Sequence, residues 1–326
     1  MPETPHFTTI SPVSHPSAQE LDHWIMSTPG GTWFHTIEAH RAVWNAEPDV
    51  LEFADQSGNR QVLYVTRLVE RAGMRYPKRH ALLYLTSPVG TAGDRSIPDW
   101  YSALAWKSGF SLVNWMFPWQ DEPYPIPAGG TVRTGLYLPV HPDPDRQIRS
   151  FSEQAKRQIR KSVPGHFDWV PARQLSMEEL SLLTGSYLAH GRKPPFAPEE
   201  LFGVLSRIPD GRVTALRYRQ SDRTLAWRLW ISDPRGWLTD WLSAIDRSNA
   251  PEPTGYHLVT HSLEYARLNH YTGLDLGGIN TAGIAEFKQR FGGVKRHGLH
   301  LLTSPNPFIR LLIRANNLRY QRNRQV

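Results

Sequence analysis

The 326-residue sequence contains no cysteine. This absence excludes a thiol nucleophile, a disulfide framework and a zinc site built on cysteine thiolates. Long apolar runs are also missing, because no stretch approaches the ~20 residues that a transmembrane helix needs. The first residues, MPETPHFTTISPV, lack the basic start and apolar block of a secretory signal peptide. These absences predict a cytoplasmic protein without a membrane span.

Several motifs that mark common enzyme classes are absent too. The sequence has no GxSxG elbow, no phosphate loop of the Walker A type, no HExxH and no GxGxxG. A serine hydrolase, a nucleoside triphosphatase and a dinucleotide-binding enzyme are therefore disfavoured. His257 and His261 have the spacing of two metal ligands on one helix face, with Glu264 one turn later. Because no closing ligand is recognisable, we predict no metal site.

The composition is that of a folded, basic protein. Hydrophobic residues make up 40% of the chain and charged residues 21%, which is a globular balance. The formal net charge is +7, and residues 285–326 hold nine Lys and Arg against one Glu. A basic surface of one sign favours phosphate-bearing partners such as RNA, a nucleotide-linked substrate, coenzyme A or anionic lipid.

One stretch near the carboxyl end combines a strand, a glycine pair and a helix. Residues 271–276 are expected to form the strand, Gly277 and Gly278 a turn, and the following residues a helix that stops at Gly292. The pattern Leu-Asp-Leu-Gly-Gly followed by Phe-Lys-x-x-Phe-Gly resembles the end of the acyltransferase domain in the FemAB-like branch of the GNAT superfamily. The resemblance implies transfer of an acyl or aminoacyl group to an amine.

The remaining elements fit the same resemblance. A basic helix capped by Ser152 is expected after a boundary near residue 145. Helices over residues 177–190, 198–208 and 255–269 enclose three strands over residues 213–219, 225–232 and 237–244. The resemblance implies an α/β (α+β) GNAT-like fold, with two GNAT-like lobes at residues 1–145 and 146–326 and mixed central sheets. A basic amphipathic helix over residues 307–324 is expected to close the chain.

The resemblance also assigns roles around the linked motif. It implies that Lys288, beside the substrate-binding Phe287, stabilises the oxyanion that develops as an amide forms. The alternative is a solvated helix lysine. Asp275 is a candidate to orient the amine or to cap the next helix. Gly278 can let the backbone approach a carbonyl closely or can simply form the turn. Proton removal is open between Asp275, the substrate and water.

Other candidates for substrate binding lie earlier in the chain. Arg192 and Lys193, in a proline-bounded loop, correspond to a region where the family uses basic groups to hold substrate phosphates. The basic cluster over residues 156–161, which includes Arg157 and Arg160, is a further candidate to meet phosphates. Exposed charges without a role are the alternative. Trp241 is a candidate to face the substrate, and a core tryptophan is the alternative there.

The donor is open from sequence. Residues 245–255, IDRSNAPEPTG, lack the pyrophosphate-cradling loop of many GNAT enzymes. We therefore expect no tightly bound cofactor, and either acyl-CoA or aminoacyl-tRNA as co-substrate, which makes tRNA a possible partner. The rival hypothesis is a non-catalytic protein that binds RNA or an anionic membrane surface through its basic tail.

Overall fold

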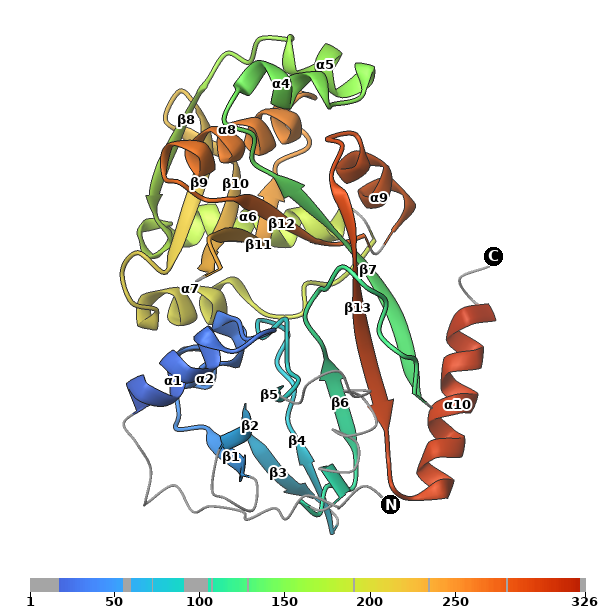
Figure 1. Cartoon of the computed structure of the whole chain (residues 1–326). Helices are drawn as coiled ribbons and strands as arrows, with labels where there is room; N and C mark the ends of the chain where they lie inside the picture. Colours follow the sequence, from blue (N-terminus) through green and yellow to red (C-terminus); the bar gives the residue numbers. More distant parts are fainter. Residues whose placement is uncertain are drawn as a thin grey trace. The chain divides into compact units, whose positions relative to one another are not determined.

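The computed structural model describes residues 18–322, apart from 55–59, 72, 91–104, 107, 128, 190, 234 and 280. The chain divides into two compact units. The first unit is Met1–Arg133 with His297–Val326, and the second unit is Thr134–Arg296. The predicted lobe boundary near residue 145 stays a prediction. Figure 1 labels the elements of both units.

The first unit contains short helices and small sheets. Its elements are α1 (Ala18–Ser27), α2 (Ile37–Trp44), β1 (Asp49–Ala54), β2 (Arg60–Thr66), β3 (Leu68–Arg71), β4 (Met74–Pro77), β5 (Val89–Gly90), β6 (Val113–Met116) and α10 (Pro307–Arg322), with a 3-10 turn at Trp33–His35. Strands β1, β2 and β5 form one sheet and β3 pairs with β4, whereas β6 pairs with β13 (Val294–Thr303). In the core, the indole of Trp115 donates to the hydroxyl of Tyr64 at 2.9 Å.

The second unit contains most of the large sheet. Its elements are β7 (Gly130–Pro139), α4 (Pro144–Arg149), α5 (Glu153–Ile159), β8 (His166–Pro171), α6 (Met177–Leu188), α7 (Pro198–Arg207), β9 (Val213–Gln220), β10 (Arg223–Asp233), β11 (Trp237–Ile245), α8 (Thr254–Leu268), β12 (Gly273–Gly278) and α9 (Ala282–Gln289), with a 3-10 turn at Ala172–Gln174. The strand order is β13-β7-β12-β11-β10-β9-β8. Strands β11 and β12 are parallel. Antiparallel pairing joins β7 with β12, β8 with β9, β9 with β10, and β10 with β11.

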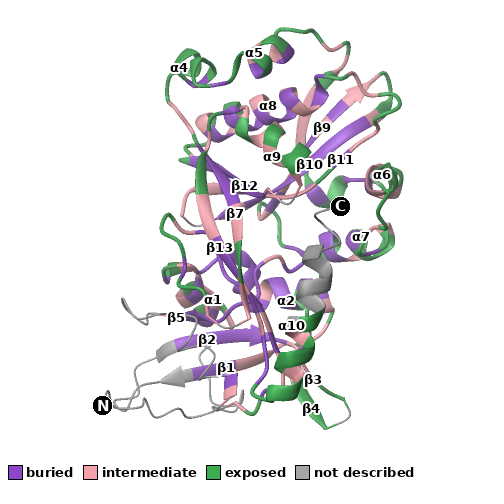
Figure 2. Ribbon diagram, turned by 90° about the vertical axis from the view of Figure 1, so that its right-hand side faces the viewer, coloured by how far each residue is buried: buried purple, intermediate pink, exposed green. Residues whose placement is uncertain are grey.

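Helices cover both faces of this sheet (Figure 1). Trp230, Leu238 and Leu274 point to one face and pack there with Val259 of α8. Side chains alternate along a strand, so Trp227 points to the opposite face. Its indole donates to the main-chain oxygen of Glu179 in α6 at 2.6 Å. The central strands are accordingly buried over most of their length (Figure 2).

Most elements expected in the second unit are present, with two corrections. Strands β9, β10 and β11 and helices α6, α7 and α8 agree with the predicted segments within a few residues. The glycine pair was predicted as a turn, but β12 runs through Gly277 and Gly278. The basic helix begins after Ser152 as predicted, because the Ser152 hydroxyl accepts from the Ala155 N–H at 3.2 Å, but it ends at Ile159, so Arg160 lies just beyond it.

Candidate functional site

The parallel strands β11 and β12 pair over only part of their length. Their register joins Trp237 to Gly273, Leu238 to Leu274 and Thr239 to Asp275, and no further pair follows in the described strands. Beyond Thr239, β11 continues to Ile245 and β12 to Gly278. The two strands therefore part in the middle of a sheet, and main-chain groups along both are released from pairing with each other.

Each of the two strands carries a bulge where they part. In the β10–β11 pairing, Leu229 faces Leu242 and Trp230 faces Asp240, which leaves Trp241 as the extra residue. In the β12–β7 pairing the register shifts between Asp275 and Gly278. Gly277 lies in this shift with φ +67°, a conformation that favours glycine. Bulges bend a strand and increase its local twist, and both bulges lie where the pairing of β11 with β12 ends.

The free edge of β11 exposes the main chain of Ser243. The Ser186 hydroxyl of α6 donates to the Ile245 carbonyl at 3.0 Å and accepts from the Ile245 N–H at 2.9 Å. Both main-chain groups of Ile245 thus point away from β10. In an antiparallel pair this orientation repeats every second residue, so the N–H and C=O of Ser243 also point away from β10. Ser243 is exposed, and these groups have no partner among the described residues.

Lys288 reaches the end of β12 from α9. Thr281 caps this helix, because its hydroxyl accepts from the Ile284 N–H at 3.3 Å. The Lys288 ammonium donates to the carbonyl oxygens of Leu276 and Gly278, the latter at 3.0 Å. An ammonium has three N–H donors, so one remains after these two bonds. The alternative of a solvated helix lysine is therefore wrong, since its charge is held against the backbone where the strands part.

Charged groups around Lys288 influence its pKa. Burial, the largest influence, lowers the pKa of the ammonium; Asp240 opposes this effect, Arg228 adds to it, and Asp275 opposes it. Asp240 and Arg228 form a two-pronged ion pair at 2.6 and 2.9 Å, with side chains only 11% and 6% exposed. Buried pairs of this kind are costly to break, because the remaining charge loses its partner.

Asp275 lies on β12 between two core leucines and points to the opposite face of the sheet from them. Its carboxylate accepts from the Gly277 N–H at 2.8 Å, within the bulge. Burial raises the pKa of Asp275 to about 6, although this hydrogen bond, Arg235 and Lys288 each lower it. The suggested helix cap is wrong, because Thr281 caps α9. A carboxylate with a pKa near neutrality is suited to exchange protons with a substrate.

Phe287 packs inside the second unit. Its ring meets the rings of Tyr256 at 5.1 Å and Phe291 at 5.3 Å, both in edge-to-face geometry. Arg290, on the same helix, donates to the Tyr256 hydroxyl. These contacts fix α9 against the first turn of α8, which follows the parted end of β11. The observed contacts of Phe287 therefore position Lys288, and its predicted contact with substrate stays a prediction.

The predicted basic residues fall into two separate places. Arg157 is exposed on α5, and Arg160 is exposed directly after the end of this helix. The Lys161 ammonium, which donates to Glu252 at 2.9 Å, lowers the pKa of this carboxylate most, and the positive charge of Arg157 adds to that effect. Glu252 lies just before α8, so Arg157 is near the first turn of α8. Arg192 and Lys193 are exposed in the loop between α6 and α7, and the structure records no contact between them and the parted strands.

The two histidines of α8 have packing roles. His261 stacks on Phe167 at 4.3 Å, and Nε2 of His257 lies 2.9 Å from the Lys161 carbonyl oxygen. Over the part of the chain that the structure describes, there is no group of three His, Asp or Glu side chains that could hold a metal ion.

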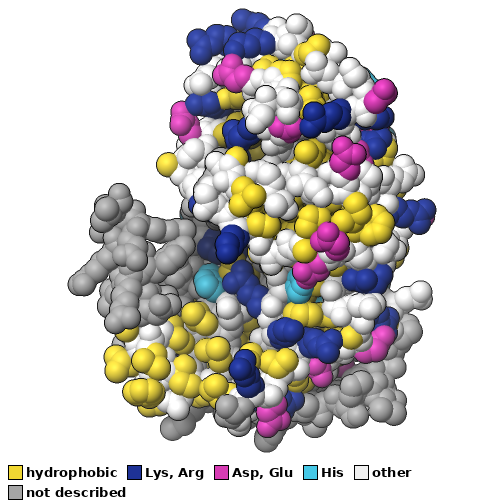
Figure 3. Space-filling view, turned by 180° about the vertical axis from the view of Figure 1, so that it is seen from behind, with side chains coloured by type: hydrophobic (Ala, Val, Ile, Leu, Met, Phe, Trp, Pro, Cys, Tyr) yellow, Lys and Arg dark blue, Asp and Glu magenta, His cyan; other side chains and the backbone are white. Residues whose placement is uncertain are grey.

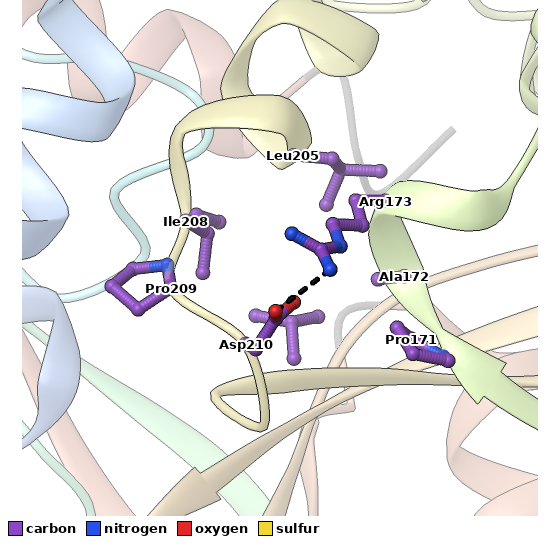
Figure 4. Close-up of a pocket in the computed structure, with 8 residues that line it drawn as sticks. Pro171, Ala172, Arg173, Leu205, Ile208, Pro209 and Asp210 are labelled. Carbon is purple, nitrogen blue, oxygen red and sulfur yellow. Dashed lines mark ion pairs between the residues drawn. The ribbon is translucent and has the colours of Figure 1, made fainter.

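A small hollow at the edge of the second unit contains none of the candidate residues (Figure 4). Its lining comes from Pro171, Ala172, Arg173, Leu205, Ile208, Pro209, Asp210 and Val213. An ion pair of 2.7 Å joins Arg173 to Asp210 there. The hollow is narrow and its charges are already paired, so it is not the candidate site.

Four residues predicted from the sequence lie where the strands part: Lys288, Asp275, Gly278 and Trp241. Ser243, the Arg228–Asp240 pair and Tyr256 were not predicted. The Arg228–Asp240 pair could have been predicted, because one Arg and one Asp interrupt two apolar strands that were expected to be neighbours. Nothing in the sequence pointed to Ser243, because its proposed role depends on strand pairing and not on its side chain.

Solved structures resemble this chain in fold. FemX superposes with a TM-score of 0.62 at 10% identity, covering 88% of this chain and 96% of that one. A tandem GNAT protein from the clavulanic acid biosynthesis pathway gives 0.53 at 11% identity, covering 93% and 99%. L-PGS from Bacillus licheniformis gives 0.50 at 13% identity, covering 94% and 96%. No family model and no curated protein matches the sequence.

These similarities confirm the predicted fold. The chain has a mixed α/β fold of the FemAB-like GNAT type, as the linked Leu-Asp-Leu-Gly-Gly and Phe-Lys-x-x-Phe-Gly motifs indicated. At such low identities the shared property is the fold itself. Among the described residues, no helix is both long and apolar enough to span a bilayer.

Proposed function

We propose that this protein is an N-acyltransferase that moves an acyl or aminoacyl group from an activated donor to an amine. The observation that carries the proposal is the position of Lys288. Its ammonium is fixed by two carbonyl groups at the place where β11 and β12 part, in a fold shared with FemX and a tandem GNAT protein. A cation held there can meet negative charge that develops on a reacting carbonyl oxygen.

The exposed edge of β11 suggests how the donor is held. An extended chain that carries amides can add to a free strand edge through main-chain hydrogen bonds. Ser243 offers one N–H and one C=O for this purpose. The arm of coenzyme A contains such amides, and so does a peptide. This edge therefore supports an amide-bearing substrate beside Lys288, with acyl-CoA as the simplest donor and aminoacyl-tRNA as the other.

In the proposed reaction, the amine nitrogen attacks the donor carbonyl carbon and its lone pair forms the new C–N bond. The carbonyl π electrons move to oxygen, where the third N–H of Lys288 stabilises the oxyanion. Collapse of this intermediate expels the thiolate of coenzyme A or the ribose oxygen of tRNA, and the nitrogen loses a proton. Asp275, the substrate or water accepts that proton.

Phosphate groups of the donor have two candidate binding regions. Arg157 lies near the first turn of α8, which follows the parted end of β11, and Arg160 follows Arg157 by three residues. We favour this pair for contact with a nucleotide. Arg192 and Lys193 remain a second proposal for a longer donor such as tRNA.

The test is a search for product. Purified protein is incubated with candidate amines and either acyl-CoA or aminoacyl-tRNA pools, and the amines are analysed by mass spectrometry. A mass shift that depends on both donor and protein is the expected result. Absence of product with every donor, together with salt-sensitive binding of RNA or lipid, would support the rival non-catalytic role.

A further inference from the structure

The helix α10 is fixed at its start to the body of the first unit. The Asn306 carboxamide oxygen accepts from the Phe308 N–H at 2.9 Å and caps the helix. The Ser304 hydroxyl just before it donates to the Ser111 carbonyl at 2.6 Å. The first turns of α10 therefore have a defined orientation on the first unit.

This orientation turns one apolar face of α10 outward. Phe308, Leu311 and Leu312 are 65%, 62% and 53% exposed. At 100° per residue these three positions share one side of the helix. Ile309 and Ile313 are half-buried and lie on a different side. The helix thus has a second apolar surface after its packing needs are met, and hydrophobic side chains gather on this part of the surface in Figure 3.

The charge of the segment identifies a partner for this face. Residues 307–326 contain five arginines and no acidic residue. Arg310 is exposed in the first turns, on the side of the helix that faces away from the apolar face. Basic residues combined with exposed Phe and Leu are the composition of helices that lie in the interface of an anionic bilayer. RNA would use the arginines but would leave the three large apolar side chains in water.

We propose that α10 docks the protein on an anionic membrane surface, with Phe308, Leu311 and Leu312 inserted among the lipids and Arg310 close to the headgroups. This docking does not depend on the proposed acyl transfer. It predicts that apolar contact and charge both contribute, so that neither neutral lipid nor high salt supports strong binding.

The experiment measures partition of the full-length protein onto two kinds of vesicle, pure phosphatidylcholine and phosphatidylcholine with phosphatidylglycerol. We expect binding only to the anionic vesicles. The variant Phe308→Ser/Leu311→Ser/Leu312→Ser should bind at least about tenfold more weakly, and Arg310→Gln about fivefold more weakly. The matched control is Phe202→Ser/Leu188→Ser/Leu268→Ser, which removes one Phe and two Leu that are 41%, 59% and 68% exposed in the second unit.

Circular dichroism checks that each variant is folded, and light scattering gives the oligomeric state without lipid. Equal loss of vesicle binding in the control variant would overturn the proposal, and so would undiminished binding in the α10 variant. A dimer that only the α10 variant dissociates would show that a second copy covers this face instead. RNA binding that the same variant abolishes would assign the face to RNA.

Discussion

Replacing Lys288 by methionine tests the catalytic proposal most directly. Methionine keeps much of the length and apolar volume of the lysine stem but has no donor and no charge. The change removes the two hydrogen bonds to the Leu276 and Gly278 carbonyls and the third N–H that we assign to the oxyanion. Helix α9 should stay in place, because Phe287 and Arg290 hold it through Tyr256.

The expected loss follows from the number of donors removed. Loss of one donor to a developing oxyanion typically lowers kcat by about 10²–10³-fold, or about 3–4 kcal/mol. Stability should fall as well, for reasons that can be separated from the loss of turnover by an unfolding measurement. Two carbonyl groups lose a partner, at a cost of about 1–3 kcal/mol each if they stay buried. Burial lowers the pKa of Lys288, which means that the folded state disfavours its charge. Removing this charge therefore offsets part of the cost.

The assay is single-turnover product formation with saturating donor, measured by mass spectrometry on wild type and variant in parallel. Lys295→Met is the matched control, because Lys295 is exposed on β13 and has no place in the site. Thermal unfolding of both variants checks the fold. If the Lys288 variant is folded and its turnover is within about threefold of wild type, the activation free energy has changed by less than about 1 kcal/mol. That result would refute the oxyanion role.

Two further substitutions test the strands on which the site is built. Asp275→Asn should raise the free energy of unfolding by up to about 3 kcal/mol above pH 6, because a shift from 3.8 to about 6 penalises the folded carboxylate by that amount. The difference in unfolding free energy between variant and wild type should shrink as the pH falls from 6 to 4, because the folded carboxyl is then protonated. Urea titrations across this range measure that difference. A difference that does not change with pH would contradict the raised pKa of Asp275. Ser243→Pro removes the exposed N–H from the edge of β11, where proline is tolerated. We expect KM for the donor to rise about fivefold, whereas Ser243→Ala, which keeps the N–H, should leave it unchanged.

The sequence was sufficient where the signal is local. Helix starts depend on one or two residues, and Ser152 caps α5 as the sequence predicted. The cap of α9 was not predicted, because Thr281 and not Asp275 provides it. The contiguous motif around Lys288 also predicted a helix where α9 lies. The alternation of apolar residues likewise located β9, β10 and β11.

What the sequence did not show depends on pairing between distant segments. Trp241 is a bulge residue because β11 has one residue more than β10 at this point of their pairing. The register shift around Gly277 is defined by the pairing of β12 with β7, a strand far away in the sequence. Glycines in a strand can mark a turn or a bulge, and only the partner strand decides between them. The free edge at Ser243 depends on where the pairing of β11 with β12 ends, so no pattern of side chains predicts it.

The charges around the site balance in a way that bears on proton transfer. The region holds the Arg228–Asp240 ion pair, the Lys288 ammonium and the Asp275 carboxylate, whose pKa burial raises to about 6. If Asp275 accepts the proton of the attacking amine, its charge disappears as the oxyanion forms beside Lys288, and the net charge of this buried region does not change. A low-dielectric site favours that path, because no new net charge has to be created in it. If Asp275 is the base, kcat/KM should fall as the pH drops below about 6, and Asp275→Asn should remove that limb of the profile. A variant that keeps the limb would assign the proton to the substrate or to water instead, and Lys288 would then act on its own.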